Sequence, residues 1–306
     1  MKHFIATLFL YLYASVVAAN DSVTLIEKMA DSFRQMNYQG IVTYQQGDKL
    51  DSLRLAHAVI DNKEYERLEY LSGKKREIIR NGSSLDCAQS VGKLVRREGT
   101  KNLAKYYHVS SIGDDRVAGR IVEGVVLEPK DDNRLSHRLF LDKQTGLLLK
   151  SVLIGKGNKV LERFQFVDIE VNADIPMSHF GKNVDDAYLA IQANEDDGAS
   201  AGDKATHTKQ WQVAWLPDGF NATTSQCYGA DEDMETFTDG VAVFSVFIEP
   251  VDKLDMAAEA QAQRGATCAY SKPLMLRDQP HRVTVVGEIP RVTAKKIAQS
   301  IILAES

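Results

Sequence analysis

Four strand-like segments follow one another in the middle of the chain with only short connections between them. They cover residues 120–128, 134–141, 147–154 and 160–171. Each is rich in β-branched and aromatic residues, which favour strands. Strands joined by so few residues must run antiparallel, because a parallel pair needs a crossover of a dozen residues or more. The sequence therefore predicts an antiparallel sheet at the centre of the fold.

The same pattern begins earlier, after one predicted helix. Leu25, Ile26, Met29, Phe33 and Met36 recur at helical spacing behind Ser22, which can cap the helix. Four further strand-like runs then follow, at 41–45, 53–60, 65–71 and 77–80, with turn signals such as Asn-Gly between them. A helix followed by many antiparallel strands predicts a curved sheet or open β-barrel with the helix on its concave side.

A change in composition near residue 190 indicates a second domain. Residues 191–210 are acidic and small, and cannot bury enough apolar surface to offset the entropy lost on ordering. Strand-like runs then occur at 211–216, 223–228, 241–249 and 282–287, with helices expected at 255–264 and 293–302. We therefore expect an α+β chain with an open-barrel domain at 20–190, a linker at 191–210 and a smaller α+β domain at 211–306.

The N-terminus has the pattern of a signal peptide. Lys2 precedes an apolar run over residues 4–17, and Val17-Ala18-Ala19 places small residues before a cleavage site. The run is shorter than the roughly 20 residues that span a bilayer. We expect residues 1–19 to be removed and the mature chain to act outside the cytoplasm.

No pattern in the chain predicts an enzyme, a metal site or a cofactor. The seven histidines show no metal-ligand spacing, and neither a phosphate-binding glycine loop nor a nucleophile elbow occurs. Asp131-Asp132 and Asp196-Asp197 lie in turn or linker sequence, where adjacent carboxylates are usually solvated. A formal net charge of −5 does not suit a general nucleic-acid binder. These observations favour a binding protein.

Two groups of residues are candidates for binding lipid. The first is apolar and would line the inner face of the curved sheet: Leu53, Leu55, Tyr65, Leu139, Leu141, Phe164 and Phe166. A cavity left there could accept acyl chains, although a fully packed core is the favoured interpretation. The second is basic and could contact phosphate groups, although a solvated surface is again favoured: Lys93, Arg96 and Arg97.

The chain has three cysteines, Cys87, Cys227 and Cys268. An oxidising compartment permits disulfides, and an odd number leaves one thiol free or paired between chains. A bridge between Cys227 and Cys268 is possible within the second domain. The alternative is that all three are small buried hydrophobic residues.

Several stretches, in order, resemble the RseB/MucB family of periplasmic negative regulators of the envelope-stress (sigma-E type) sigma factor. They are residues 36–44, 52–57, 73–80, 106–109, 116–120, 127–131, 141–150, 215–220, 237–240, 285–290 and 293–298. Gly119 departs from the Asp common in the family. Residues 83–103 match poorly, so the resemblance implies no role for Lys93, Arg96 or Arg97.

The resemblance implies a lipoprotein-carrier-like open barrel followed by a smaller domain. It also implies a periplasmic location and binding to the periplasmic part of a membrane-spanning anti-sigma factor, which is shielded from the first protease of the stress cascade. Release by lipid or lipopolysaccharide and assembly into homo-oligomers are further implications. The small domain and the side facing the linker are where the partner is expected. The alternatives are a periplasmic lipid or lipoprotein carrier and a secreted hydrolase whose site is scattered along the sequence.

Overall fold

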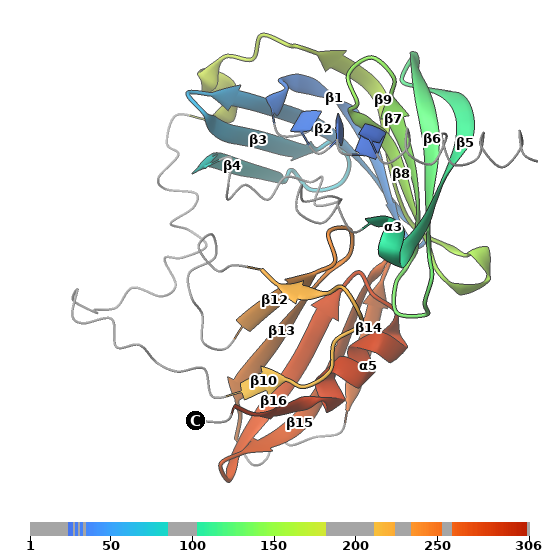
Figure 1. Cartoon of the computed structure of the whole chain (residues 1–306). Helices are drawn as coiled ribbons and strands as arrows, with labels where there is room; N and C mark the ends of the chain where they lie inside the picture. The colour runs from blue at the N-terminus through green and yellow to red at the C-terminus, as the bar shows by residue number, and fades with distance from the viewer. Residues whose placement is uncertain are drawn as a thin grey trace, which may run out of the picture.

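The computed structural model describes residues 24–26, 28–29, 31–32, 35–84, 103–181, 211–223, 234–252 and 259–304. Within these residues the fold consists of one large curved sheet, a smaller six-stranded sheet packed beneath it and a two-stranded sheet (Figure 1). The predicted signal peptide and the predicted linker at 191–210 lie outside the described residues. No helix in the described part of the chain is long and apolar enough to cross a bilayer.

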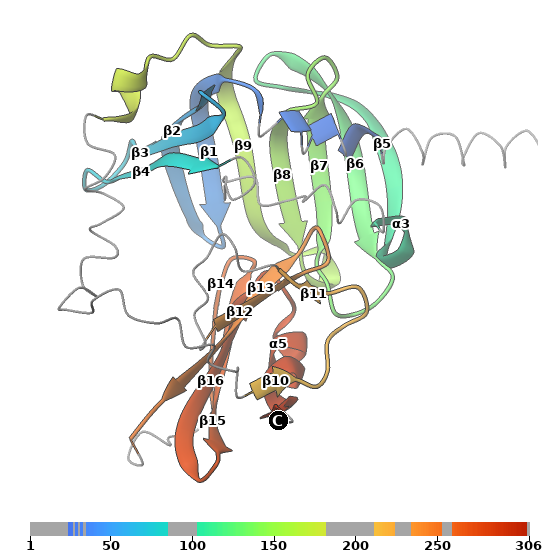
Figure 2. The same ribbon diagram turned by 60° about the vertical axis from the view of Figure 1, so that its left-hand side comes forward.

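The large sheet has nine strands in the order β4-β3-β2-β1-β9-β8-β7-β6-β5. Its strands are β1 (Tyr38–Gln46), β2 (Lys49–Ile60), β3 (Lys63–Tyr70), β4 (Glu77–Ser84), β5 (Tyr107–Val117), β6 (Arg120–Pro129), β7 (Ser136–Asp142), β8 (Leu148–Ile154) and β9 (Val160–Val171). Every neighbouring pair is antiparallel. The order ends at β4 and β5, which do not pair with each other, so the sheet is curved but not closed (Figure 2).

Local irregularities help the large sheet to bend. Register shifts occur in five of its strand pairs, including one between Ile41 and Val42 where β1 pairs with β9. Such bulges increase twist and bend a strand. Beside that shift, a Cβ on Gly40 would lie 2.2 Å from the carbonyl oxygen of Asp168. Only glycine therefore permits the close approach of β1 and β9 at this point.

The predicted N-terminal helix packs into the core of the large sheet. Its described residues between 24 and 35 are helical, and Ile26 and Met29 are buried with the apolar residues of the sheet. The Ser32 hydroxyl and the Lys28 ammonium donate hydrogen bonds to the carbonyls of Thr145 and Gln144. These bonds attach the helix to the loop between β7 and β8.

The smaller sheet has six strands in the order β11-β12-β13-β16-β15-β14. They are β11 (Asn221–Ala222), β12 (Met234–Thr238), β13 (Val243–Pro250), β14 (Ala260–Arg264), β15 (Thr267–Leu276) and β16 (Gln279–Gly287). Helix α5 (Arg291–Gln299) packs on β15 and β16, and β10 (Trp211–Val213) pairs with β17 (Ile301–Leu303). Short helices α3 (Leu103–Tyr106), η1 (Lys156–Asn158) and η2 (Met177–Phe180) complete the described elements.

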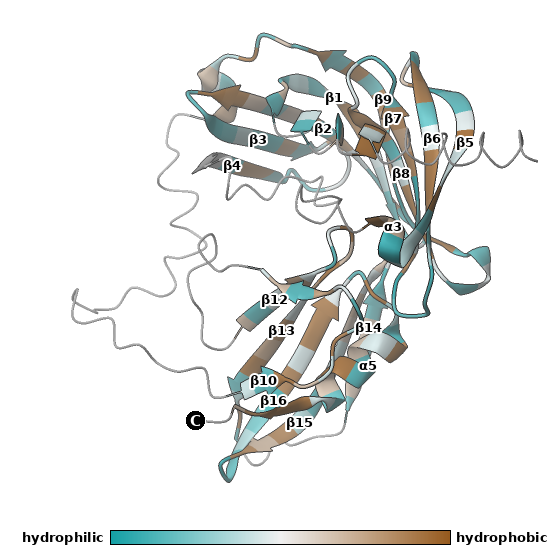
Figure 3. Ribbon diagram, viewed as in Figure 1, coloured by the Kyte–Doolittle hydropathy of each residue, from teal (hydrophilic) through white to brown (hydrophobic). Residues whose placement is uncertain are grey.

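Each sheet has its own apolar core. Tyr38, Leu55, Leu127 and Phe166 belong to the core of the large sheet, and Trp211 and Phe244 belong to that of the small one. Brown segments in Figure 3 mark the apolar residues along the strands of both sheets. The predicted class is confirmed: a mostly-sheet α+β fold with a large open antiparallel sheet and a separate smaller sheet.

The structure corrects three predictions of individual elements. Residues 260–264 form strand β14 rather than the end of a helix; residues 253–258 lie outside the described part. The last helix ends at Gln299 instead of continuing to residue 302, because the chain turns at Ser300 to form β17. The strand predicted at 211–216 ends at Val213. Strands β5, β11, β12 and β15 were not predicted.

Candidate functional site

A buried ion pair joins the two sheets. The Arg134 guanidinium, from the loop between β6 and β7, donates from Nε to Oδ2 of Asp239 over 2.6 Å. Asp239 lies in the turn between β12 and β13 of the small sheet. Both side chains are fully buried, with 0% of their surface exposed. Charges are buried in this way only when paired and hydrogen-bonded, so the two sheets meet here in a specific geometry.

Each oxygen of Asp239 has several donors. Oδ2 also accepts the hydroxyl proton of Tyr107, the first residue of β5, over 2.9 Å. Oδ1 accepts the backbone N–H groups of Val241 and Ala242, over 2.9 and 2.8 Å. Oδ1 thus stabilises the turn that carries Asp239, and Oδ2 accepts the hydrogen bonds from the large domain. Burial and the adjacent Asp239 carboxylate raise the pKa of Tyr107 well above its ordinary value, which keeps it protonated as a donor.

Arg134 has further partners on both sides of the junction. It donates to the Asp131 carboxylate on its own loop and to the Asp218 carbonyl of the small domain. Its guanidinium carbon lies 4.9 Å from the ring centre of Tyr106 and 5.1 Å from that of Phe220. Cation–π contacts of this kind are made more often by arginine than by lysine.

Close packing fixes the loop that carries Phe220. Gly219 has φ +88°, and a Cβ there would lie 2.3 Å from the Tyr106 ring. Val241, two residues beyond Asp239, is 2% exposed and packs into the core of the large sheet. The turn of the small domain therefore inserts an apolar side chain into the other domain beside the ion pair.

His137 on β7 is buried near this junction without a hydrogen-bond partner on either ring nitrogen among the described residues. Burial lowers its pKa to about 4, although the Asp239 carboxylate acts in the opposite direction. The ring is therefore neutral at physiological pH. Protonation would place a charge without a hydrogen-bond partner at a fully buried position.

A second contact joins the turn between β14 and β15 to the large sheet. Ala266 is fully buried with Leu135 and Leu153 of the large sheet. Its N–H lies 3.5 Å from Oε2 of Glu162, a carboxylate that is 9% exposed. A Cβ on Gly265 would lie 2.4 Å from the Gln46 side chain. The two domains are thus held at two separate points.

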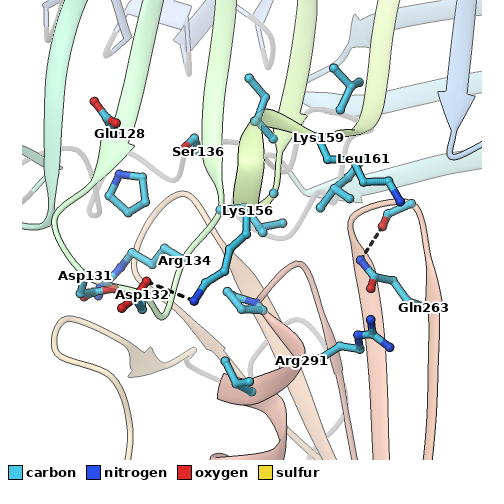
Figure 4. A pocket seen from close by; sticks show the side chains of 18 of the residues that line it. Glu128, Asp131, Asp132, Arg134, Ser136, Lys156, Lys159, Leu161, Gln263 and Arg291 are labelled. Atoms are coloured by element: carbon cyan, nitrogen blue, oxygen red, sulfur yellow. Dashed lines mark hydrogen bonds and ion pairs between the residues drawn. The ribbon is translucent and has the colours of Figure 1, made fainter.

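An open groove of about 680 Å³ lies between these two contacts (Figure 4). The large sheet and its loops supply Gly47, Glu128, Pro129, Asp131, Asp132, Arg134, Leu135, Ser136, Ile154, Gly155, Lys156, Lys159, Val160 and Leu161. The small domain supplies Gln263, Gly265, Pro290, Arg291 and Val292. Ligand sites commonly have this size and occur at domain junctions. Among the described residues, no three His, Cys, Asp or Glu side chains are placed to bind a metal ion.

The seven apolar lipid-binding candidates lie in the cores beneath the large sheet. Leu53, Leu55, Leu139, Leu141, Phe164 and Phe166 belong to its main core, and Tyr65 packs against Phe180 in a smaller one. None is more than 8% exposed. Their role in lipid binding stays a prediction. Lys93, Arg96 and Arg97 lie outside the described residues.

Cys268 is a buried free thiol on β15, and its Sγ donates to the carbonyl of Ile289 over 3.0 Å. Burial raises the pKa of this thiol to about 11. Cys227 and Cys87 lie outside the described residues. The predicted bridge between Cys227 and Cys268 therefore stays a prediction.

Two family comparisons cover most of the chain. Residues 21–184 match the MucB/RseB N-terminal domain, and residues 205–302 match the MucB/RseB C-terminal domain. The chain belongs to the MucB/RseB family. Its members among the curated relatives are named as regulatory proteins of sigma factors.

Individual MucB/RseB proteins match over nearly their whole length. The sigma factor AlgU regulatory protein MucB of Pseudomonas aeruginosa is 32% identical over 298 residues, which cover 92% of this chain and 91% of MucB. The sigma-E factor regulatory protein RseB of Escherichia coli strain K12 is 25% identical over 311 residues, covering 94% and 92%.

Solved structures of MucB match the three-dimensional fold. The complex of Pseudomonas aeruginosa MucA and MucB aligns with a TM-score of 0.70 and 30% identity, covering 94% of this chain and 100% of the matched chain. A crystal structure of MucB in complex with MucA(peri) aligns with a TM-score of 0.69 and 29% identity, covering 93% and 100%.

Sequence reasoning did not single out the residues of the junction, although the MucB/RseB resemblance contained most of them. Tyr107, Asp218, Gly219, Phe220 and Asp239 all lie in stretches that carry the resemblance, and Arg134 follows another by three residues. These stretches are distant in sequence and meet at one place in the fold. Their shared resemblance to one family was the signal in the sequence that could have pointed to the junction.

Proposed function

We propose that this chain is a periplasmic regulator that binds the periplasmic part of a membrane-spanning anti-sigma factor. The supporting observation is the match over 94% of the chain to the complex of MucA and MucB, at 30% identity. At that coverage the match extends over both sheets. The predicted signal peptide at 1–19 is consistent with export to the compartment where such a segment is found.

Binding would shield the anti-sigma segment from proteolysis, and a lipid or lipopolysaccharide signal would release it. For release, the partner and the lipid must prefer different arrangements of the two domains, and their difference in affinity sets the size of the response. The junction at Arg134 and Asp239 is a contact whose opening would distinguish two such arrangements. The predicted linker at 191–210 would keep the domains tethered, and assembly into homo-oligomers is part of the same proposal.

The buried junction favours a regulator over the alternative of a lipid or lipoprotein carrier. A carrier needs only the open sheet, and it gives the small domain no role. Removing residues 211–306 would leave Arg134 without its Asp239 partner and would expose the apolar site that Val241 fills. If the chain transports a lipid or lipoprotein and still does so after that deletion, it is a carrier and the proposal is wrong.

Affinity purification tests the function directly. The mature chain, tagged and immobilised, should retain one membrane protein from a detergent extract of the envelope of the producing organism. Mass spectrometry should identify it as a protein with a cytoplasmic sigma-factor-binding domain and one membrane span. Lipopolysaccharide added to the wash should elute it. Retention of no such protein would refute the proposed function.

A further inference from the structure

A row of buried side chains crosses the large sheet where it meets the small domain (Figure 2). The strand register places Leu127 of β6, His137 of β7 and Leu153 of β8 opposite one another, and Glu162 of β9 continues the row. Residues paired in this way lie on the same face of a sheet. Leu153 packs with Ala266 of the small domain. The row therefore brings two ionisable side chains, His137 and Glu162, to the domain junction.

His137 has no hydrogen-bond partner that would stabilise a charge. Both ring nitrogens are buried and unpaired among the described residues, and none of the side chain is exposed. Its neighbours across the strands, Leu127 and Leu153, are apolar. A neutral imidazole fits such a site, whereas an imidazolium ion would have neither water nor an acceptor.

Asp239 is the charged group among the described residues whose field reaches the imidazole, but its oxygens are already occupied. Oδ2 accepts from Arg134 and Tyr107, and Oδ1 accepts two backbone N–H groups. Arg138, the next residue along β7, lies on the opposite, exposed face. Protonation of His137 would therefore add a second cation beside an ion pair that is already complete.

Glu162 responds to acid in the opposite sense. It lies two strands from His137, or about 10 Å across the sheet. It accepts hydrogen bonds from Tyr44 and Gln46, and the N–H of Ala266 lies 3.5 Å from it. Burial raises the pKa of this carboxyl, so the closed junction binds a proton here more tightly than an exposed glutamate does. Acid therefore weakens the junction at His137 and not at Glu162.

Movement of the small domain would relieve the buried charge without unfolding either sheet. Each sheet has its own core, and near His137 the small domain inserts the Val241 side chain into the large one. Withdrawal of the turn that carries Asp239 and Val241 would admit water to the face of the sheet where His137 lies. Local openings of this kind cost less free energy than global unfolding.

We propose that His137 makes closure of the two domains sensitive to acid: its imidazolium form favours an open arrangement in which the turn between β12 and β13 has left the large sheet and both cores stay folded. The inference concerns the chain alone and does not depend on the proposed partner. In the closed arrangement the pKa of His137 is about 4, and contact with water returns it to about 6.5. The ratio of open to closed molecules should therefore rise about thirtyfold from pH 8 to pH 5.

Thiol labelling measures this opening. The mature chain carries Val241→Cys, with Cys87 and Cys227 replaced by serine, and reacts with a dipyridyl disulfide, which labels thiols in acid as well as at neutral pH. Peptide mass spectrometry gives the rate at each position, divided by the rate in denaturant at the same pH. Cys268, fully buried in the core of the small domain, reports unfolding.

The normalised rate at position 241 should rise about thirtyfold from pH 8 to pH 5. It should also exceed the rate at Cys268 by tenfold or more at every pH, because opening precedes unfolding. Equal rates at the two positions would show that acid unfolds the protein instead of opening the junction, and would overturn the inference. A rate at position 241 that does not rise would overturn it as well.

Three variants of the labelled chain assign the response. His137→Leu breaks no hydrogen bond and should abolish the rise. His108→Leu, which replaces an exposed histidine on β5, and Glu162→Gln should both keep it. A rise that persists in His137→Leu would refute the assignment. If that variant does not fold, the pH profile of the chain that keeps His137 decides: the rise must begin near pH 6.5, and a rise that begins only below pH 4.5 belongs to carboxyl groups and overturns the inference.

Discussion

Arg134 and Asp239 are 105 residues apart in sequence and form a hydrogen-bonded ion pair, 2.6 Å long and fully buried, between the two domains. The pair does more than join two surfaces. Asp239 also organises the turn that inserts Val241 into the other core, so its charge, the turn and the domain contact depend on one another.

Replacing Asp239 by asparagine should destabilise the protein by about 3 kcal/mol, because it leaves the buried Arg134 charge with only the partly exposed Asp131 carboxylate as counter-charge. Chemical denaturation followed by tryptophan fluorescence measures the change. The matched control is Asp114→Asn, which breaks an exposed ion pair with Lys143 and should leave the midpoint unchanged. Equal effects from the two variants would contradict the assigned role of the buried pair.

Neutralising both members of the pair should be less harmful than neutralising one. The double variant R134M/D239L removes both charges and keeps much of the apolar volume. Buried ion pairs replaced in this way often lose little stability. The double variant should therefore be more stable than Asp239→Asn alone in the same denaturation experiment. A double variant at least as unstable as the single one would show that the hydrogen bonds to Tyr107 and the Asp239 turn matter more than the charges.

His137 should make stability depend on pH. Its pKa falls from 6.5 to about 4 on folding, so the unfolded chain binds a proton that the folded chain does not in this interval. Stability from this group is complete above pH 6.5 and is lost as the pH falls toward 4, by roughly 3 kcal/mol in total. Denaturation at several pH values should show the free energy of unfolding falling with a steady slope from pH 6.5 to pH 4, and His137→Leu should reduce that slope. An identical slope in the variant would exclude His137 as its source.

Gly219 should be intolerant of even one added carbon. Gly219→Ala combines a positive φ of 88° with a clash of 2.3 Å against the Tyr106 ring. Gly73→Ala has a similar φ of 81° and nothing within 4 Å. The strain of the backbone is common to both variants. The additional loss of unfolding free energy in Gly219→Ala, expected at about 1–3 kcal/mol, therefore measures the packing of the junction. Equal melting temperatures would contradict that packing.

Cys268 should react with thiol reagents only after unfolding. The thiol is buried and its pKa is raised to about 11, so little thiolate exists at neutral pH. Alkylation in native and denaturing buffer, followed by peptide mass spectrometry, tests this. If Cys268 stays unmodified in denaturant until a reductant is added, it is held in a disulfide, and a linked pair of peptides containing Cys227 and Cys268 would identify the predicted bridge.

The parts of the fold that were predicted have strong local signals. Strands β6 to β9 are rich in apolar, β-branched and aromatic residues and are separated by short connections. Strand β5 lacks this signal, because residues 110–116 are all exposed at the edge of the sheet. Residues 260–264 contain good helix formers, yet pairing with β15 makes them a strand, since tertiary contacts override local propensity.

The candidate site was mostly hidden from the sequence. Arg134 and Asp239 have no spacing that links them, and a buried ion pair between domains is created only by the fold. The groove residues Lys159, Val160 and Arg291 look like ordinary surface residues in the sequence. The apolar candidates such as Leu55 and Phe166 were visible because they alternate along strands, which identifies a core more readily than a binding site.

The most direct test of the central claim is the rate at which the periplasmic segment of the anti-sigma factor is cleaved by the first protease of its cascade. A saturating amount of the mature chain should slow cleavage strongly, because the bound segment is shielded from the protease. Cleavage at an unchanged rate in the presence of the bound, unmodified chain would contradict the account.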